Sequence, residues 1–165
     1  MAAGATYTPI ATTTLGSAQA SYTFSSIPST YTDLILVLNA SSVATADIMV
    51  QLNSDTGSNY SRTKLTGNGT AASSSRTANA DRLYLNTTSN TTTTAGEYNS
   101  ITSFNNYSNT TTYKTTLTRA NAASLGTDAL VQLWRSTAAI STIYVYSTGT
   151  FSAGSTFTLY GIKAA

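Results

Sequence analysis

The chain has 165 residues, no cysteine and no histidine, and only 8% of its residues are charged, with a formal net charge of +2. These absences exclude Ser-His-Asp and Cys-His nucleophiles, His/Cys zinc sites and disulfides. The basic residues are scattered singly, so we expect no nucleic acid partner. The length predicts one domain over residues 1–165, and the Thr-rich composition favours strands.

Three strands are predicted near the N-terminus. Tyr7–Thr14 predicts an opening strand, which must lie at a sheet edge because Pro9 lacks a backbone donor. Ser21–Phe24 alternates and predicts a short strand. Asp33–Asn39 contains the longest aliphatic run, Leu34–Leu38, which is too short for a membrane span of about 20 residues. We therefore expect no membrane partner, and we predict a strand that other β-structure covers on both faces.

The middle of the chain alternates between strands and polar loops. Ile48–Asn53 predicts a half-buried strand with Ile48, Val50 and Leu52 pointing inward. A turn at Asn53–Asn59 and a strand at Tyr60–Thr66 should follow it. Thr70–Ala80 has almost no large apolar side chain and is predicted to be a surface loop. In the segment Asp81–Asn86, the leucines should face one way.

The second half predicts hairpins. The low-complexity tract Thr87–Gly96 predicts a long exposed loop. Strands at Glu97–Asn106 and Thr111–Arg119 should flank a hairpin connection at Asn106–Thr110, and Asn121–Gly126 should be a loop.

Three further strands are predicted near the C-terminus. They are Ala129–Trp134, Ile140–Tyr146 and Thr156–Ile162, with a turn at Ser147–Gly149. In total, eight to ten short strands with turns roughly every 8–12 residues are typical of an all-β sandwich or barrel. The long connections favour an antiparallel β-sandwich of jelly-roll type over an up-and-down barrel.

The sequence contains few residues that could act in catalysis. The whole set of carboxylates is Asp33, Asp47, Asp55, Asp81, Glu97 and Asp128. A glycosidase needs two carboxylates across one cleft, and nothing in this spacing pairs them. The segment Asp55–Asn59 faintly resembles the start of a calcium loop but lacks further carboxylates, so a turn is the better interpretation. We expect no enzyme activity, no metal and no cofactor.

Aromatic residues with polar tips are the remaining candidates for contacts, because such side chains suit sugar platforms and subunit interfaces. Tyr107 and Tyr113 lie in or beside an Asn/Thr-rich loop and are candidate contact residues. Trp134 is a third candidate, as a core or an interface residue.

Six stretches in order along the chain resemble a family of jelly-roll proteins from tailed bacteriophages. They are residues 10–17, 24–34, 52–61, 106–110, 133–136 and 154–162, with sequences such as Phe24-Ser25-Ser26-Ile27-Pro28 and Leu133-Trp134-Arg135-Ser136. The resemblance implies a small oligomeric virion protein, found as head decoration or in tail-associated domains. It carries no catalytic residues.

Two functions follow from this resemblance. The first is a capsid decoration or cement protein that binds the major capsid protein, and we expect it to form a homotrimer. The alternative is a tail-fibre or baseplate tip that binds host glycans through Tyr107, Tyr113 or Trp134. A carbohydrate-processing enzyme is a weaker third possibility. The N-terminus lacks the pattern of a signal peptide, so we expect assembly into the virion in the host cytoplasm.

Overall fold

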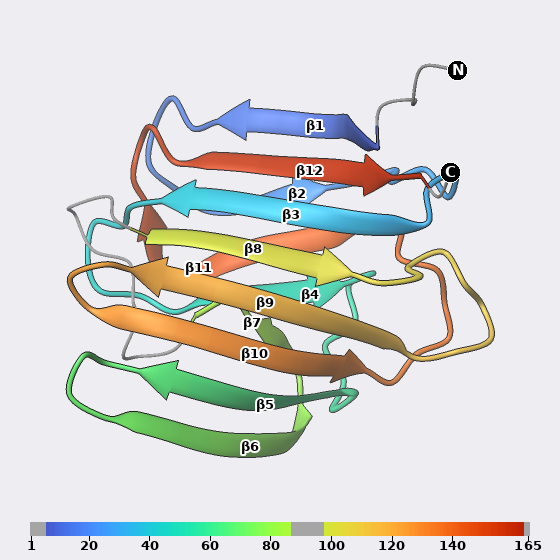
Figure 1. The fold of residues 1–165 in the computed structure, drawn as a ribbon. Coiled ribbons are helices and arrows are strands. Elements are labelled where there is room, and N and C mark those ends of the chain that lie inside the picture. The colour runs from blue at the N-terminus through green and yellow to red at the C-terminus, as the bar shows by residue number, and fades with distance from the viewer. Residues whose placement is uncertain (1–5, 87–97, 164–165) are drawn as a thin grey trace.

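The computed structural model describes residues 6–86 and 98–163 and contains two antiparallel sheets in these ranges (Figure 1). The large sheet has the order β1 (Tyr7–Thr14), β12 (Thr156–Ile162), β3 (Asp33–Ala40), β8 (Tyr98–Phe104), β9 (Lys114–Ala122), β10 (Gly126–Trp134), β5 (Tyr60–Gly67), β6 (Ala72–Ala80). The small sheet has the order β2 (Gln19–Phe24), β11 (Ile143–Phe151), β4 (Ile48–Leu52), β7 (Leu83–Tyr84). The described part of the chain contains no helix long and apolar enough to cross a membrane.

The strand order is that of a jelly roll with two added hairpins. Without β5, β6, β9 and β10, the large sheet reads β1-β12-β3-β8 and faces β2-β11-β4-β7. The chain then passes from one sheet to the other at every step from β1 to β4 and from β7 to β12, as in a double-sheet jelly roll. The predicted fold class is confirmed, with twelve strands in the described residues instead of eight to ten.

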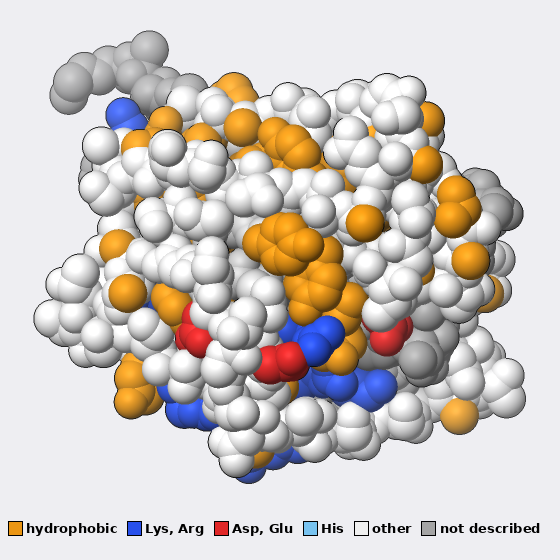
Figure 2. Space-filling view, turned by 180° about the vertical axis from the view of Figure 1, so that it is seen from behind, with side chains coloured by type: hydrophobic (Ala, Val, Ile, Leu, Met, Phe, Trp, Pro, Cys, Tyr) orange, Lys and Arg blue, Asp and Glu red, His pale blue; other side chains and the backbone are white. Residues whose placement is uncertain are grey.

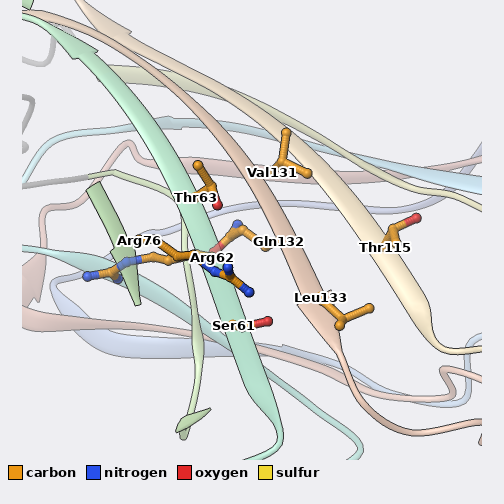
Figure 3. A pocket seen from close by; sticks show the side chains of 8 residues that line it. All are labelled: Ser61, Arg62, Thr63, Arg76, Thr115, Val131, Gln132 and Leu133. Atoms are coloured by element: carbon orange, nitrogen blue, oxygen red, sulfur yellow. The ribbon is translucent and has the colours of Figure 1, made fainter. Parts of the chain in front are cut away.

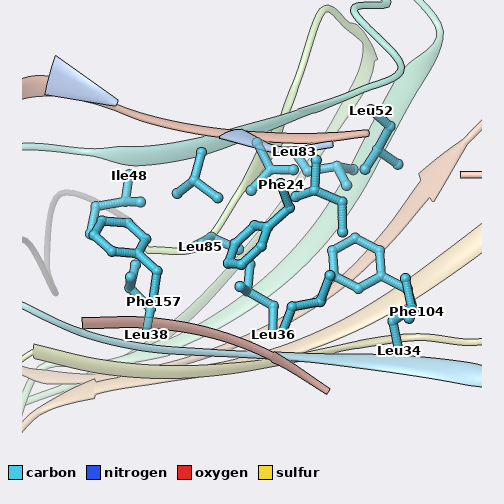
Figure 4. Close-up of a cluster of buried hydrophobic side chains, with 14 of the residues drawn as sticks. Phe24, Leu34, Leu36, Leu38, Ile48, Leu52, Leu83, Leu85, Phe104 and Phe157 are labelled. Atoms are coloured by element: carbon cyan, nitrogen blue, oxygen red, sulfur yellow. The ribbon is translucent and has the colours of Figure 1, made fainter. Parts of the chain in front are cut away.

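The core lies between the two sheets, and β3 supplies its centre. Leu34, Leu36 and Leu38 are completely buried and point toward side chains of the small sheet (Figure 4). Burial of each leucine contributes about 1.5–3 kcal/mol relative to an exposed position. The rings of Phe151 in β11 and Phe157 in β12 meet edge to face at 5.0 Å and link the two sheets.

The prediction that both faces of β3 are covered is wrong. Ile35 and Val37 alternate with the buried leucines and are only partly buried, because they point to the outer face of the large sheet. Neighbouring side chains on the same sheet cover them partially, and neither of the two described sheets forms a second layer over them. An unbroken aliphatic run therefore marks here a strand with one core face and one apolar outer face.

Two added hairpins extend the large sheet beyond the jelly roll. The strands β9 and β10 pair along their length, from Ala122 opposite Gly126 to Lys114 opposite Trp134. On its other side, β10 pairs with β5. The predicted surface loop at Thr70–Ala80 is wrong, because β6 occupies most of it and pairs with β5. As an edge strand it is exposed almost throughout, so it has no apolar alternation to reveal it.

Several boundaries differ from the predictions by a few residues. The strand β1 lies at the sheet edge as Pro9 requires, with a register shift between Pro9 and Ala11. The strand β11 continues through the predicted turn at Ser147–Gly149, with an irregularity in its pairing to β2. The predicted loop at Thr87–Gly96 lies outside the described residues.

Candidate functional site

The outer face of the large sheet carries the most unusual surface among the described residues. Leu65 in β5, Leu117 in β9 and Val131 in β10 are 56%, 52% and 59% exposed. In each strand, the residues directly before and after this exposed residue point to the opposite, inner face of the sheet. The three exposed side chains therefore project from the same outer surface. Single exposed leucines are ordinary, but a group of them on one face marks an interaction site.

The register makes these side chains neighbours. Val131 lies directly opposite Leu117, and Leu65 lies opposite Ala129, two residues along β10 from Val131. Side chains directly opposite each other on one face are about 4.5–5.5 Å apart at Cβ, and diagonal neighbours are still within contact range.

The stripe continues onto the jelly roll itself. Ile101 in β8 lies opposite Val37 in β3, and Ile35 is the next outward residue of β3. We call this set the outer apolar stripe, and its members are Leu65, Val131, Leu117, Ile101, Val37 and Ile35. It crosses five strands that are neighbours in the sheet (Figure 1).

Three open hollows lie along the stripe. The first, of about 320 Å³, is lined by Leu65, Ala129 and Arg119, among others. The second, of about 270 Å³, lies between Ile101, Leu117 and Arg119. The third, of about 250 Å³, has a lining that includes Val131 and Leu133 and is shown in Figure 3. Shallow hollows of this kind accept protruding side chains of a partner better than they enclose a small substrate.

Two arginines flank the stripe. Arg119 lies directly opposite Ile101, and Arg76 in β6 lies directly opposite the outward Thr63. Both are exposed, and neither forms an ion pair among the described residues. On the opposite face of the molecule, by contrast, acidic and basic side chains lie next to each other (Figure 2). The outer face therefore presents positive charge beside the stripe that no described carboxylate neutralises in an ion pair.

Tyr107 and Trp134, two of the three predicted contact residues, are core residues. Tyr107 is completely buried and donates its hydroxyl hydrogen to the carbonyl oxygen of Pro28. Trp134 is 2% exposed, stacks on Tyr60 with ring centroids 6.3 Å apart, and donates its indole N–H to Asp55. Neither ring is accessible to a partner in this fold.

Tyr113, the third predicted contact residue, is exposed. Its side chain is 54% accessible and lies in the connection between β8 and β9, just before the buried Lys114. Tyr113 is thus the one predicted contact residue that this fold leaves open to a ligand. Leu65, Leu117 and Val131 were not predicted as contact residues, because alternation shows that residues share a face but does not say which face is buried.

The segment Asp55–Asn59 forms a turn, as predicted. The Asp55 carboxylate accepts hydrogen bonds from the Gly57 amide at 2.8 Å, from the Asn59 side chain at 2.9 Å and from Trp134 at 2.7 Å. Burial acts to raise the pKa of Asp55, but these hydrogen bonds together hold it below its ordinary value of 3.8. Within the described ranges, no three side chains of the types that bind metals lie close enough to hold an ion.

The inner face of the added strands carries several buried polar side chains among its apolar ones. Gln132 accepts a hydrogen bond from the Tyr84 amide at 2.8 Å and donates one to the Tyr84 carbonyl at 2.9 Å. The Arg62 guanidinium lies 3.7 Å above the Tyr84 ring. These contacts hold the two-residue strand β7 against the large sheet.

A pair of carboxylates lies near this polar layer. Burial raises the pKa of Asp47. The positive charges of Arg62 and Lys64 lower this pKa in part, and the negative charge of Asp128 raises it further. Asp128 is buried and accepts a hydrogen bond from the Thr66 hydroxyl at 2.6 Å. A raised pKa suits a general acid, but none of the hollows described above is lined by Asp47. None of these three hollows therefore brings the two carboxylates together.

Comparisons with protein-family models, with curated proteins and with solved structures find no match for this chain. Its function must therefore be inferred from its own surface and chemistry.

Proposed function

We propose that the chain is a non-enzymatic structural protein of a bacteriophage virion, a capsid decoration protein that binds the head shell as an oligomer. The observation that carries this proposal is the outer apolar stripe, a broad and shallow apolar surface flanked by cationic side chains. Such a surface is suited to binding another protein. The jelly-roll strand order is the fold that the family resemblance implies, and it supports the virion assignment.

A binding role also fits the chemistry of the acidic groups. Asp55 and Asp81 are engaged in hydrogen bonds or an ion pair with neighbouring side chains, and Asp128 is buried. Groups held in this way stabilise loops and strands and are not presented to a substrate. The described residues thus favour recognition over catalysis.

Copy number tests the proposal. Quantitative mass spectrometry of purified particles of the virus that encodes the chain should find it at a fixed ratio to the major capsid protein. A copy number that matches the tail proteins instead would overturn the head assignment. Binding of the purified protein to head shells assembled without it, followed by sedimentation, should saturate at the same ratio.

The proposed homotrimer has a separate test. Light scattering on the purified protein should give three times the chain mass of 17.2 kDa. A monomer mass over the whole accessible concentration range would contradict the trimer, but it would not contradict shell binding.

Recognition of host glycans by a tail tip is the second candidate, and the exposure of Tyr113 favours it. An aromatic ring with a polar tip on an exposed loop can stack on a sugar. A glycan array with the isolated protein should then show specific binding that Tyr113→Ala abolishes. Tyr7→Ala is the matched control, because Tyr7 is 57% exposed but lies on the edge strand β1. Binding that survives both substitutions would remove Tyr113 from consideration.

A further inference from the structure

Among the described residues, the apolar centre of the outer face carries no acidic side chain. The described outward residues around the stripe are apolar, hydroxyl-bearing or amide side chains, together with Arg76 and Arg119. Asp33, at the end of β3, is the nearest described carboxylate on this face by register, and it accepts a hydrogen bond from the backbone N–H of Asn106 at 2.6 Å. A partner surface that covers the stripe must therefore supply the negative charge itself.

A second copy of the chain is poorly equipped to do so. A two-fold contact would place this face on itself, so Arg76 and Arg119 of both copies would enter one contact in which Asp33 is the only described carboxylate of either face. The other described carboxylates are engaged in their own chain: Asp55 binds Trp134, Asp81 pairs with Arg82, and Asp128 binds Thr66. Asp47 has one buried carboxylate oxygen and lies at the start of β4, in the other sheet. The charge pattern therefore favours a foreign partner.

The face is large enough for a specific interface. Eight strands spaced about 4.8 Å apart and about eight residues long span roughly 34 Å by 26 Å, or about 900 Å². A stable protein–protein interface buries about 800 Å² on each partner. An apolar centre is typical of the buried core of an interface, and arginine is enriched among interface hot spots.

We infer that the outer apolar stripe, with Arg76 and Arg119, is the surface by which this protein docks onto an acidic protein surface that presents apolar side chains. This inference rests on the proposed function, under which that acidic surface belongs to the assembled head shell. Leu117 and Val131 supply the desolvated centre of the contact, and the two guanidinium groups pair with carboxylates of the shell.

The test uses head shells assembled without this protein and measures binding of the full chain by sedimentation. Val131→Ser and Leu117→Ser combined should weaken binding by at least about tenfold, because they remove the apolar centre of the contact. Val43→Ser is the matched control, because Val43 is 58% exposed but lies in the connection between β3 and β4. It should bind as the unsubstituted protein does.

Reversing the charge of Arg119 gives a second test of the same surface. Arg119→Glu should weaken binding by at least about tenfold and reduce its sensitivity to salt, since it replaces an attraction with a repulsion. Lys163→Glu makes the same change in net charge beyond the end of β12, away from the stripe, and should change binding little. Circular dichroism and thermal melting of every variant show whether it is folded.

The outcomes separate the two proposals. If the unsubstituted protein does not bind the shells, the proposed function fails, and the docking inference fails with it. If it binds and the stripe variants bind equally well, the proposed function stands and the inference about this face is wrong. If the stripe substitutions dissociate the chain's own oligomer and leave shell binding intact, a second copy covers the face, and the inference is again overturned.

Discussion

The indole N–H of Trp134, at the end of β10, donates a hydrogen bond to the Oδ2 atom of Asp55 over 2.7 Å. The two residues are 79 positions apart in the chain, and the contact joins the loop after β4 to the end of β10 in the large sheet. This hydrogen bond explains why neither residue is free for a ligand. The tryptophan is held in the core by its polar atom as well as by its ring, and the carboxylate is already occupied.

Removal of this carboxylate should destabilise the protein. Asp55→Ala should lower the free energy of unfolding at neutral pH by about 1–2 kcal/mol, because the Gly57 amide, the Asn59 side chain and the Trp134 indole lose their charged acceptor. Trp134 is the only tryptophan, so its fluorescence in a urea titration reports the transition directly. An unchanged urea midpoint would show that the hydrogen bond contributes nothing to stability.

The pH dependence of this effect has a definite sign. The folded protein holds the pKa of Asp55 below the ordinary value of 3.8, so the ionised carboxylate stabilises the fold above that value. This stability is lost as the pH falls through the lowered pKa. The difference between the unsubstituted protein and Asp55→Ala should therefore shrink as unfolding is measured at successively lower pH. A constant difference between pH 7 and the acid limit would contradict the lowered pKa.

Asp47 should behave in the opposite way. Burial raises the pKa of Asp47, so the contribution of this group to stability is largest at low pH and is lost as the pH rises through the raised pKa. The free energy of unfolding of Asp47→Asn, relative to that of the unsubstituted protein, should therefore be higher at pH 7 than at pH 3. Urea midpoints at the two pH values measure this, and an effect that is equal at both would argue against the raised pKa.

Two leucine substitutions test which face of the sheet is the core. Leu36→Ala should cost about 2–5 kcal/mol, because Leu36 is completely buried and the substitution leaves a cavity. Leu117→Ala should cost less than about 1 kcal/mol, because Leu117 is half exposed on the outer face. Chemical denaturation of both variants gives the comparison. Equal costs would place Leu117 in a buried layer that this fold does not contain.

A glycine pair tests the packing at the end of β12. A Cβ atom at Gly161 would lie 2.3 Å from Cγ of Tyr31, so Gly161→Ala must displace that ring. We expect a loss of about 1–3 kcal/mol from overpacking. Gly16→Ala is the control, because nothing lies within 4 Å of the added Cβ there and φ is not in the left-handed region. Thermal melting of the two variants should separate them clearly; similar melting temperatures would contradict the close contact with Tyr31.

The sequence by itself was enough to predict the strands in which inward and outward residues alternate, and the edge position of the strand that contains Pro9. Ile48, Val50 and Leu52 are completely buried as predicted, and Pro9 lies on an edge strand. These features depend on residues that are close in the chain, since a two-residue period fixes which side chains share a face. The jelly-roll class followed from the number and spacing of such strands.

Only the tertiary structure decided which face of each strand is buried and which neighbours it has. In β9 the threonines at 116 and 118 point inward and Leu117 points outward, the reverse of what hydrophobicity alone favours. Some of the buried polar groups find partners distant in the chain, such as the Thr118 hydroxyl, which lies 2.9 Å from that of Thr102. The stripe likewise arises from pairing between strands, and pairing is a long-range property that no local pattern encodes.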